Sequence, residues 1–400
     1  MEELVASSLE DLSNNTGDFW AQTVPVLEDP SQLRFAIDAY ATYHPVIVTG
    51  IIDHWPALSK WDKNYLANAV RSKVGINLTP DGHGDCIKTV GNRKQFVYPA
   101  EISANMSTFF HLLENMQPEA VVPYLSQQND NLRTDMECLL KDIDPTLPLV
   151  DEIFGGCAPE AVNVWIGDER SVSSIHKDHY ENMYAVVHGE KTFTLFPPTD
   201  IAFFPEDIFP TSRYELSEEA KKMLTEFEDD PDPFHGVASQ PSSSSPSCRN
   251  NTGAGLTLTG ADLSLVRAGD EDGSSGRLSW LPFDPEDARE NLLTGHPPLR
   301  LSHPLRVRVR AGQVLYIPAM WYHRVSQSQF TIAVNYWYDQ RFDHRYDCVC
   351  LGRSFHCPVK LLPTCFCFAY SRYVFAQLAK SLHVNAKANS EEDGTVIVDI

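Results

Sequence analysis

The chain has 400 residues, 42% of them hydrophobic and 22% charged, which is enough for one large domain or two ordinary ones. Its formal net charge of −22 argues against direct nucleic-acid binding and favours basic proteins or peptides as partners. No secretory signal opens the sequence and no segment reaches the ~18 apolar residues of a membrane span, so we expect no membrane association. With 9 cysteines, an odd number, we expect reduced thiols and a location in the cytoplasm, with the nucleus as a second compartment.

Apolar residues recur at helical spacing early in the chain, and short strands dominate later. The expected helices are residues 2–12, 31–43, 62–71 and 107–115. Between them, HPVIVTG is a short strand bracketed by Pro45 and Gly50. From Val162 onward the pattern is mostly strand, in AVNVWIG, YAVVHGEKTFTLFPP, LRVRVRAGQVLYIPA and FTIAVNYWY. This order predicts an α+β chain whose β part is a barrel or a sandwich.

Two segments interrupt the pattern. The first, about residues 224–277, contains SQPSSSSPSCRNNTGAG and acidic runs. We predict that much of it is disordered, because it has too little apolar surface to offset its ordering entropy. The second, residues 347–369, is rich in Cys and aromatics. Two C-x-C pairs and His356 allow a zinc site there, although ordinary zinc ribbons favour C-x₂-C. We favour an insertion without evolved structure, translated from a retained intron in the gene model.

The stretch SVSSIHKDHYENMY contains the strongest chemical signal. His176 and Asp178 alternate along an extended segment and therefore project to one side, where they can share a metal ion. His323 follows an apolar strand and a proline in GQVLYIPAMWYHRV. Two histidines and one carboxylate form the facial triad of non-haem Fe(II) oxygenases, which leaves coordination positions open. His179 and His188 are competing ligands, but His179 would point to the opposite face and His188 lies in a predicted turn.

A lysine and several polar or aromatic residues accompany this triad. Lys191 lies on the apolar strand GEKTFTLFPP, where a lysine is costly unless it has an anionic partner. Tyr124, Asn182, Asn335 and Trp337 offer donors and a flat wall for a small dicarboxylate. Asn335 and Trp337 can equally be ordinary residues of a strand.

These residues lie in stretches that resemble the jumonji-C (JmjC) oxygenases, which use Fe(II) and 2-oxoglutarate. The resemblance covers most of residues 20–216 and 279–347, and its core is AVNVWIGDERSVSSIHKDHYENMYAVVHGEKTFTLFPP and AGQVLYIPAMWYHRVSQSQFTIAVNYWYD. It implies a double-stranded β-helix, a jelly-roll or cupin-like barrel, within the α+β chain. We therefore divide the chain into an N-terminal helical and strand flank (1–120), the JmjC core (121–346), the Cys-rich insertion (347–369) and a C-terminal helix with an acidic tail (370–400).

The resemblance also implies what the site residues do. The implied Fe(II) ligands are His176, Asp178 and His323. The residues implied to lie near 2-oxoglutarate are Tyr124, Ser173, Asn182, Lys191, Asn335 and Trp337. Lys191 would bind the distal carboxylate of 2-oxoglutarate, helped by the hydroxyls of Tyr124 and Ser173. Family members commonly have Thr where Ser173 stands, so we expect slightly looser packing there. Molecular oxygen is the remaining co-substrate.

HPVIVTGIIDHWPAL, LTPDGHGD, FVYPAE and HKDHYENMY narrow the resemblance to JmjC lysyl (3S)-hydroxylases that modify developmentally regulated GTP-binding proteins. The implied reaction is hydroxylation at C3 of a lysine that a GTP-binding protein presents. An acidic wall would suit the lysine ammonium group, and the candidates are Asp81, Asp85 and Asp339, although solvated turns explain these residues equally well. The C-terminal helices of this subgroup are associated with dimerisation, and the Cys-rich insertion leaves a homodimer open here.

Other functions compete with this interpretation. A different JmjC specificity, as an asparaginyl hydroxylase or a histone lysine demethylase, fits the same motifs. A peptidase is disfavoured, because the sequence has no nucleophile elbow and no H-E-x-x-H helix. A non-catalytic, cupin-like binding protein is disfavoured by the intact triad and by Lys191.

Overall fold

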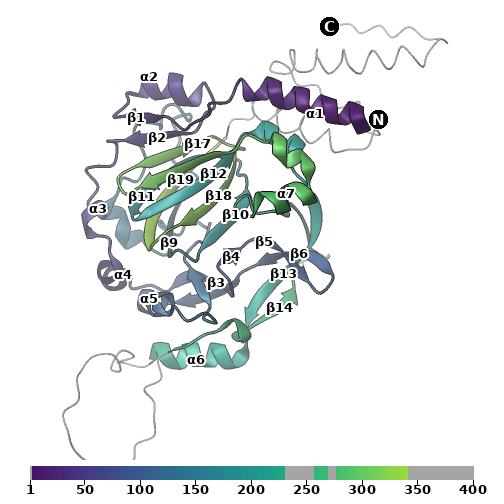
Figure 1. Cartoon of the computed structure of the whole chain (residues 1–400). Helices are drawn as coiled ribbons and strands as arrows, with labels where there is room; N and C mark the ends of the chain where they lie inside the picture. The colour runs from purple at the N-terminus through teal and green to yellow at the C-terminus, as the bar shows by residue number, and fades with distance from the viewer. Residues whose placement is uncertain (1, 230–255, 269–275, 341–400) are drawn as a thin grey trace, which may run out of the picture.

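The computed structural model describes residues 2–229, 256–268 and 276–340, and the strands gather into a barrel with helices around it (Figure 1). The expected helices form close to their predicted positions. The helices are α1 (Glu2–Gly17), α2 (Gln32–Phe35), α3 (Ala57–Lys60), α4 (Lys63–Ala69), α5 (Met106–Glu114), α6 (Glu218–Asp229) and α7 (Arg289–Gly295), with shorter turns at η1 (Ala36–Tyr40), η2 (Glu137–Asp142), η3 (Pro198–Phe203), η4 (Gly260–Asp262) and η5 (Pro297–Leu301). None of these helices is long and apolar enough to cross a membrane.

Two sheets form the barrel, which confirms the expected jelly-roll architecture. A 6-stranded sheet has the order β1-β2-β17-β11-β19-β9, and a 5-stranded sheet has the order β16-β12-β18-β10-β4. The bounds of the first sheet are β1 (Val26–Glu28), β2 (Val46–Thr49), β17 (Val314–Ile317), β11 (Tyr180–His188), β19 (Thr331–Asp339) and β9 (Ala161–Gly167). Those of the second are β16 (Leu305–Arg310), β12 (Glu190–Phe196), β18 (Tyr322–Gln327), β10 (Val172–His176) and β4 (His83–Gly84). Both sheets include strands from residues 1–120, so the N-terminal flank is part of the barrel wall.

Side-chain alternation explains why these segments form strands around a common core. In β16, Leu305, Val307 and Val309 are buried while the arginines between them are exposed. The buried residues join Phe193 of β12 and Tyr184 of β11 in one apolar cluster between the two sheets. This cluster fills the barrel interior and supports the side chains at its polar end.

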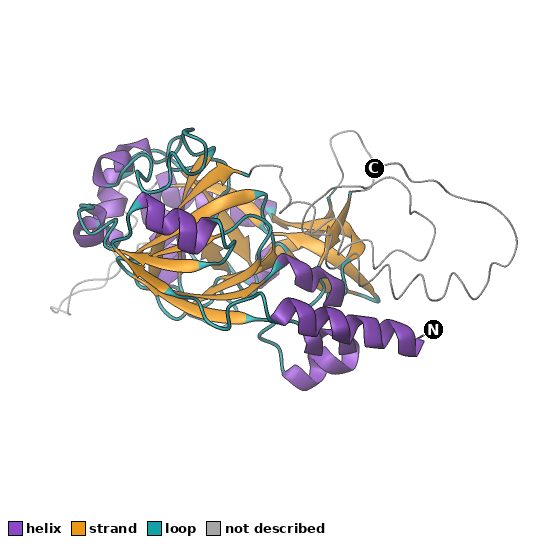
Figure 2. Ribbon diagram, turned by 90° about the horizontal axis from the view of Figure 1, so that it is seen from above, coloured by secondary structure: helices purple, strands orange, loops and turns teal. Residues whose placement is uncertain are grey.

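The 6-stranded sheet is covered on its outer face as well. Met183 and Ala185 of β11 point away from the barrel interior and pack in a second apolar cluster with Phe35, Leu66 and Phe109 from the N-terminal helices. Figure 2 shows helices outside the strands, as this packing requires. Cover on both faces explains why β11 and β19 are almost continuously buried.

Two smaller sheets extend from the barrel. One has the order β14-β13-β6-β5, with β15 pairing β13, and the other has the order β7-β3-β8. Their bounds are β14 (Leu263–Arg267), β13 (Asp207–Leu216), β6 (Arg93–Tyr98), β5 (Cys86–Val90), β15 (Arg277–Trp280), β7 (Ala100–Ala104), β3 (Val74–Thr79) and β8 (Val122–Tyr124).

The predicted disorder of residues 224–277 is wrong at both ends of the segment. Helix α6 continues to Asp229, and Leu224 on it is buried. Residues 230–255 lie outside the described ranges. Beyond them, Leu256 and Leu258 are 4% and 0% exposed, and β14 pairs antiparallel with β13. The segment around β14 thus buries more apolar surface than its composition indicated. The predictions for residues 347–369 and 370–400, including the zinc site, lie outside the described residues.

Candidate functional site

A bulge in the second sheet brings the two predicted histidine ligands face to face. Strands β10 and β18 pair at Ser173 and Val325, and then at His176 and His323, so β10 has one more residue than its partner between these pairs. A bulge of this kind bends the strand and redirects its side chains. The centroids of the two imidazole rings lie 4.2 Å apart.

Backbone carbonyl groups orient both imidazoles. Nδ1 of His176 lies 2.7 Å from the carbonyl oxygen of Ser174, and Nδ1 of His323 lies 3.0 Å from that of Trp321. A carbonyl oxygen only accepts, so each Nδ1 carries the proton and each Nε2 keeps its lone pair for a metal. The same tautomer in both rings is the one that two metal ligands need.

Asp178 completes the cluster from the segment between β10 and β11. Its Oδ2 lies 3.4 Å from Nε2 of His323 and 3.8 Å from Nε2 of His176. Among the described residues, these three form the group whose ligand atoms all lie within 4.8 Å of one another. Burial opposes ionisation of Asp178, but His176 and His323 lower its pKa overall, and burial together with His323 lowers the pKa of His176. A neutral imidazole and an ionised carboxylate are the protonation states that bind metal.

A turn positions His323 and fixes Asp178. Met320 has a φ of 67°, in the left-handed region, and its N–H donates to the backbone carbonyl of Asp178 over 2.8 Å. The turn that begins the strand of one ligand therefore holds the backbone of another.

Lys191 is fully buried on β12. Its Nζ donates to Oε1 of Gln327 over 2.6 Å and to the hydroxyl of Tyr124 over 3.1 Å. No carboxylate in the described ranges forms an ion pair with it, and burial lowers its pKa from 10.5 to about 7. The hydrogen-bond partners of Lys191 are neutral, so they leave the charge of its ammonium group uncompensated. Such a buried cation can bind an anion.

Lys191 and His323 lie on the same face of the β12–β18 strand pair, whereas His176 lies on the neighbouring strand β10. Leu195 is opposite His323 and Lys191 is opposite Gln327, so the two sites are four residues apart, or about 13 Å along the strand. Lys191 and the His-Asp-His cluster therefore lie on one sheet of the barrel. The hydroxyl of Tyr124 lies next to the Lys191 ammonium group. Burial raises the pKa of Tyr124, and its hydrogen bond with Ser173 lowers this pKa in part.

The two asparagines belong to one buried network. Nδ2 of Asn335 donates to Oδ1 of Asn182 over 3.3 Å, and Oδ1 of Asn335 accepts from Nε1 of Trp165 over 2.9 Å and from Asn163 over 3.3 Å. The network fixes the orientation of the Asn335 amide. These contacts also give Asn335 a structural role that the sequence left open.

Trp337 has a different environment. It is 6% exposed and lies parallel to Tyr180, with ring centroids 4.9 Å apart. Its buried Nε1 has no hydrogen-bond partner in the described part of the chain. An unpaired buried donor is costly and rare in folded proteins. The nitrogen and oxygen atoms of the His-Asp-His cluster are donors that suit a metal ion, and the buried ammonium group of Lys191 suits an anion.

The three predicted acidic residues differ in their surroundings. Asp81 is exposed and its carboxylate pairs with Lys88 at 2.6 Å. Asp339 is exposed at the end of β19, opposite Tyr180. Asp85 has a φ of 50° and follows β4, and its backbone carbonyl accepts from the Ser174 hydroxyl, two residues before His176. Burial and the nearby charge of Glu101 raise the pKa of Asp85 to about 6. Asp85 is therefore the most enclosed of these three acidic residues.

Neither competing histidine joins the cluster. Nδ1 of His179 lies 3.2 Å from Nε2 of Gln340, and His188 packs against Phe330 with ring centroids 5.6 Å apart. Both therefore have packing roles at the edges of the barrel, as expected for His179.

Three residues of the site were missed from the sequence. Gln327 binds Lys191, as described above. Trp280 of β15 lies parallel to the ring of His176 within 5°, at 6.3 Å between centroids, and its buried Nε1 has no hydrogen-bond partner in the described ranges. Gly167 ends β9 where a Cβ atom would lie 2.7 Å from both Gln327 and Tyr124. Only the close approach of Gly167 had a sequence signal, namely a glycine at the end of a strand.

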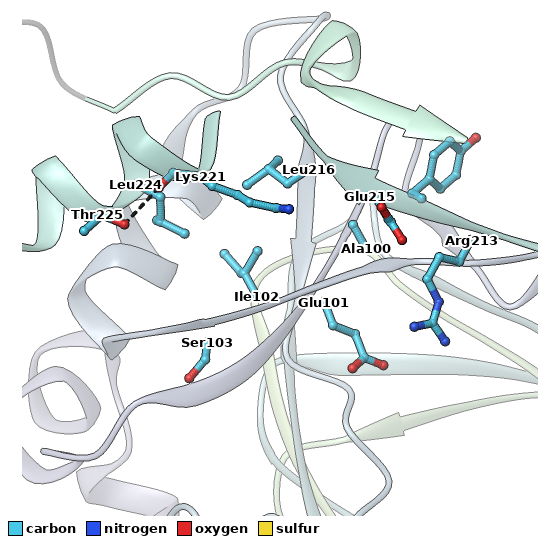
Figure 3. A pocket seen from close by; sticks show the side chains of 11 residues that line it. Ala100, Glu101, Ile102, Ser103, Arg213, Glu215, Leu216, Lys221, Leu224 and Thr225 are labelled. Atoms are coloured by element: carbon cyan, nitrogen blue, oxygen red, sulfur yellow. Dashed lines mark hydrogen bonds between the residues drawn. The ribbon is translucent and has the colours of Figure 1, made fainter. Parts of the chain in front are cut away.

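A groove of about 420 Å³ lies between β7, β13 and α6 (Figure 3). Figure 3 shows the carboxylate of Glu101 and the guanidinium of Arg213 on the same side of this groove. The charge of Glu101, which lines this groove, also contributes to the raised pKa of Asp85.

Comparison with known proteins identifies the family. The sequence matches the Cupin-like domain family over residues 32–344. It is 34% identical over 325 residues to the human protein named Bifunctional peptidase and (3S)-lysyl hydroxylase JMJD7, covering 81% of this chain and 86% of the human protein. The chain belongs to the cupin-like JmjC family.

Two further relatives are similar over nearly the same length. JmjC domain-containing protein E of Dictyostelium discoideum is 29% identical over 343 residues, covering 80% of this chain and 85% of its own. Lysine-specific demethylase JMJ32 of Arabidopsis thaliana is 34% identical over 329 residues, covering 79% and 81%. Membership of the JmjC family agrees with the barrel and with the His-Asp-His cluster at its polar end.

Proposed function

We propose that this JmjC protein is an Fe(II)- and 2-oxoglutarate-dependent hydroxylase of lysine side chains in proteins. The observation that supports it most strongly is the convergence of His176, Asp178 and His323 at a sheet that also holds a buried lysine without an anionic partner in the described ranges. A metal site alone fits many proteins, and a buried cation alone fits many cores. A metal site and a buried cation on one sheet together fit a metal ion and a dicarboxylate co-substrate.

The chain's own residues would do the following work. Nε2 of His176, Nε2 of His323 and the carboxylate of Asp178 would hold Fe(II), and the carbonyl groups behind the imidazoles would keep the rings in place. Lys191 and Tyr124 would bind the distal carboxylate of 2-oxoglutarate. When bound, the metal and 2-oxoglutarate activate molecular oxygen for insertion of one oxygen atom into a C–H bond. The protein orients the substrate and excludes water.

The surroundings of His176 support a lysine as substrate. Asp85 lies beside β10, and the parallel ring of Trp280 lies 6.3 Å from His176. A carboxylate and an aromatic face together suit an ammonium group on an alkyl chain. We assign Asp85 to the ammonium group, whereas Asp81 is already paired with Lys88. Asp339, which lies opposite Tyr180 in the pairing of β11 with β19, is the second candidate for binding the ammonium group.

The finer identity of the substrate is also a proposal. The human relative is named a (3S)-lysyl hydroxylase, and this chain resembles the hydroxylases of developmentally regulated GTP-binding proteins. The name of the human relative mentions no GTP-binding protein, so this substrate rests on the resemblance of the sequence motifs alone. We propose a GTP-binding protein that presents a lysine as the first substrate to test. We propose C3 of the lysine as the hydroxylated carbon, action in the cytoplasm and the nucleus, and a homodimer as the assembly to test.

Product analysis tests the reaction. Purified protein is incubated with Fe(II), 2-oxoglutarate and a lysine-containing GTP-binding protein, and the product is mapped by tandem mass spectrometry. The proposal expects one lysine to gain one oxygen atom, with Asp178→Ala as the inactive control. Loss of a methyl group from methylated lysine would favour a demethylase, as the Arabidopsis relative is named, and a cut chain would favour the peptidase in the human relative's name.

A further inference from the structure

Gln327 and Lys191 lie directly opposite each other on neighbouring strands. Their Cα atoms are partners in the antiparallel pairing of β12 with β18, and Nζ of Lys191 donates to Oε1 of Gln327 over 2.6 Å. Gln327 is 6% exposed and Lys191 is 0% exposed. The amide is therefore the nearest acceptor to the buried ammonium group.

The hydrogen-bond partners of the Gln327 amide allow only one orientation of this group. Its Nε2 donates to the backbone carbonyl of Asp168 over 2.7 Å. An ammonium group can only donate and a carbonyl oxygen can only accept, so Oε1 must face Lys191 and Nε2 must face Asp168. The two ends of the amide have opposite requirements, and glutamine meets both.

The Asp168 backbone that receives this amide is itself held in place. Arg170 contacts both carboxylate oxygens of Asp168, at 2.6 Å for the closest pair, and donates to the carbonyl groups of Leu113 and Asn115 at the end of α5. Gly167 removes the side chain that would otherwise collide with Gln327 and Tyr124. The support behind Gln327 is thus rigid, which keeps the amide at a fixed place.

We infer that Gln327 is a positioning residue that orients the Lys191 ammonium group without neutralising it, so that its charge is left for the distal carboxylate of a 2-oxo diacid. A neutral amide supplies a hydrogen bond but no net charge. A carboxylate at the same place would form an internal ion pair and compete with the co-substrate. This inference rests on the proposed function, because the anion is its co-substrate.

Binding to the Mn(II)-loaded protein tests the inference without catalysis. The probes are 2-oxoglutarate and 2-oxopentanoate, which has the same chain length but no distal carboxylate. We expect Gln327→Glu to weaken 2-oxoglutarate binding at least about 10-fold, the loss typical of a charge-assisted hydrogen bond, while 2-oxopentanoate and Mn(II) affinities stay within about 2-fold of wild type. Gln329→Glu makes the same charge change at an exposed position two residues away and should bind both acids like wild type.

A purely structural role for Gln327 predicts another pattern. If Gln327→Glu binds 2-oxoglutarate as wild type does, or loses both acids equally, the inference is overturned. If that variant does not fold, Gln327→Met, which is neutral, replaces it: a selective loss of 2-oxoglutarate binding supports the inference and equal affinities overturn it. Wild type that binds 2-oxoglutarate but makes no hydroxylated product refutes only the proposed function, whereas wild type that binds neither acid refutes both.

Discussion

Oδ2 of Asp178 and Nε2 of His323 lie 3.4 Å apart, although 145 positions separate the two residues in the chain. The turn containing Met320 joins them, because its N–H binds the backbone of Asp178 just before the strand that contains His323. The segment that leads into the strand of His323 thus also holds the backbone of Asp178, so the fold itself brings these candidate metal ligands together.

Removing a predicted ligand should remove metal binding and spare the fold. We expect His176→Ala or Asp178→Ala to lower Mn(II) affinity by more than about 100-fold, the upper range for losing even an outer partner of a metal site. Calorimetric titration measures the affinity, and thermal melting checks the fold. Asp339→Ala removes an exposed carboxylate at the end of β19 and should bind Mn(II) normally. Normal Mn(II) binding by both ligand variants would falsify the metal site.

Lys191→Met keeps the length of the side chain and removes its charge. Mn(II) should bind as before, but affinity for 2-oxoglutarate should fall about 10- to 100-fold, because a charge-assisted hydrogen bond in a buried place is lost. Binding to the Mn(II)-loaded variant gives the answer. Lys222→Met, at an exposed position on α6, is the matched control. Unchanged affinity in Lys191→Met would mean that Lys191 is only a strand residue.

The lowered pKa of Lys191 predicts how stability depends on pH. The folded chain releases the proton near pH 7, whereas the unfolded chain keeps it to about 10.5, so the unfolded chain binds more protons between these values. The free energy of unfolding of wild type, relative to Lys191→Met, should therefore rise from pH 7 to 10.5. Urea unfolding of both proteins at several pH values measures the difference. A flat or falling difference would show that Lys191 stays charged when buried.

The same lowered pKa predicts how 2-oxoglutarate binding depends on pH. The distal carboxylate needs a charged Lys191, so affinity should decrease above pH 7, and binding at pH 8 should take up protons from the buffer. Calorimetry in buffers of different ionisation enthalpy measures this uptake. Binding heats that do not depend on the buffer would contradict the prediction.

Leu258 tests whether the end of the supposed disordered segment packs. It is 0% exposed, whereas Leu33 on α2 is 70% exposed. Leu258→Ala should lower the free energy of unfolding by about 2–5 kcal/mol, and Leu33→Ala by less than about 0.5 kcal/mol. Urea denaturation compares the two variants. Equal midpoints would mean that residues 256–268 do not contribute to the core.

The strands of the barrel could be predicted because their signals are local. LRVRVR alternates residue by residue and forms β16, and AVNVWIG forms β9. The clustering of His176 and Asp178 could be predicted because a histidine and an aspartate at alternate positions of an extended segment project to the same side. The packing of residues 256–268 could not be predicted, because the low-complexity composition of the whole segment hid the alternating pattern in LTLTGADLSLV. The strand in this stretch forms only by pairing with β13.

The partners of the site residues were harder to predict. Gln327 looks like any polar residue at the end of a strand, and its importance comes from lying opposite Lys191 in another strand. Trp280 follows the acidic insertion, and only the pairing of β15 with β13 brings it to His176. Strand register decides such contacts, and one sequence does not reveal register between distant strands.

Labelled oxygen gives the most direct test of the central claim that this barrel inserts an oxygen atom into a protein lysine. The reaction is run under ¹⁸O₂ with Fe(II), 2-oxoglutarate and the GTP-binding protein, and the lysine peptides are measured by mass spectrometry. The account predicts one ¹⁸O atom on the lysine side chain and one in succinate, with neither product in Asp178→Ala. Turnover of 2-oxoglutarate without labelled lysine, or lysine that contains oxygen from water, would contradict it.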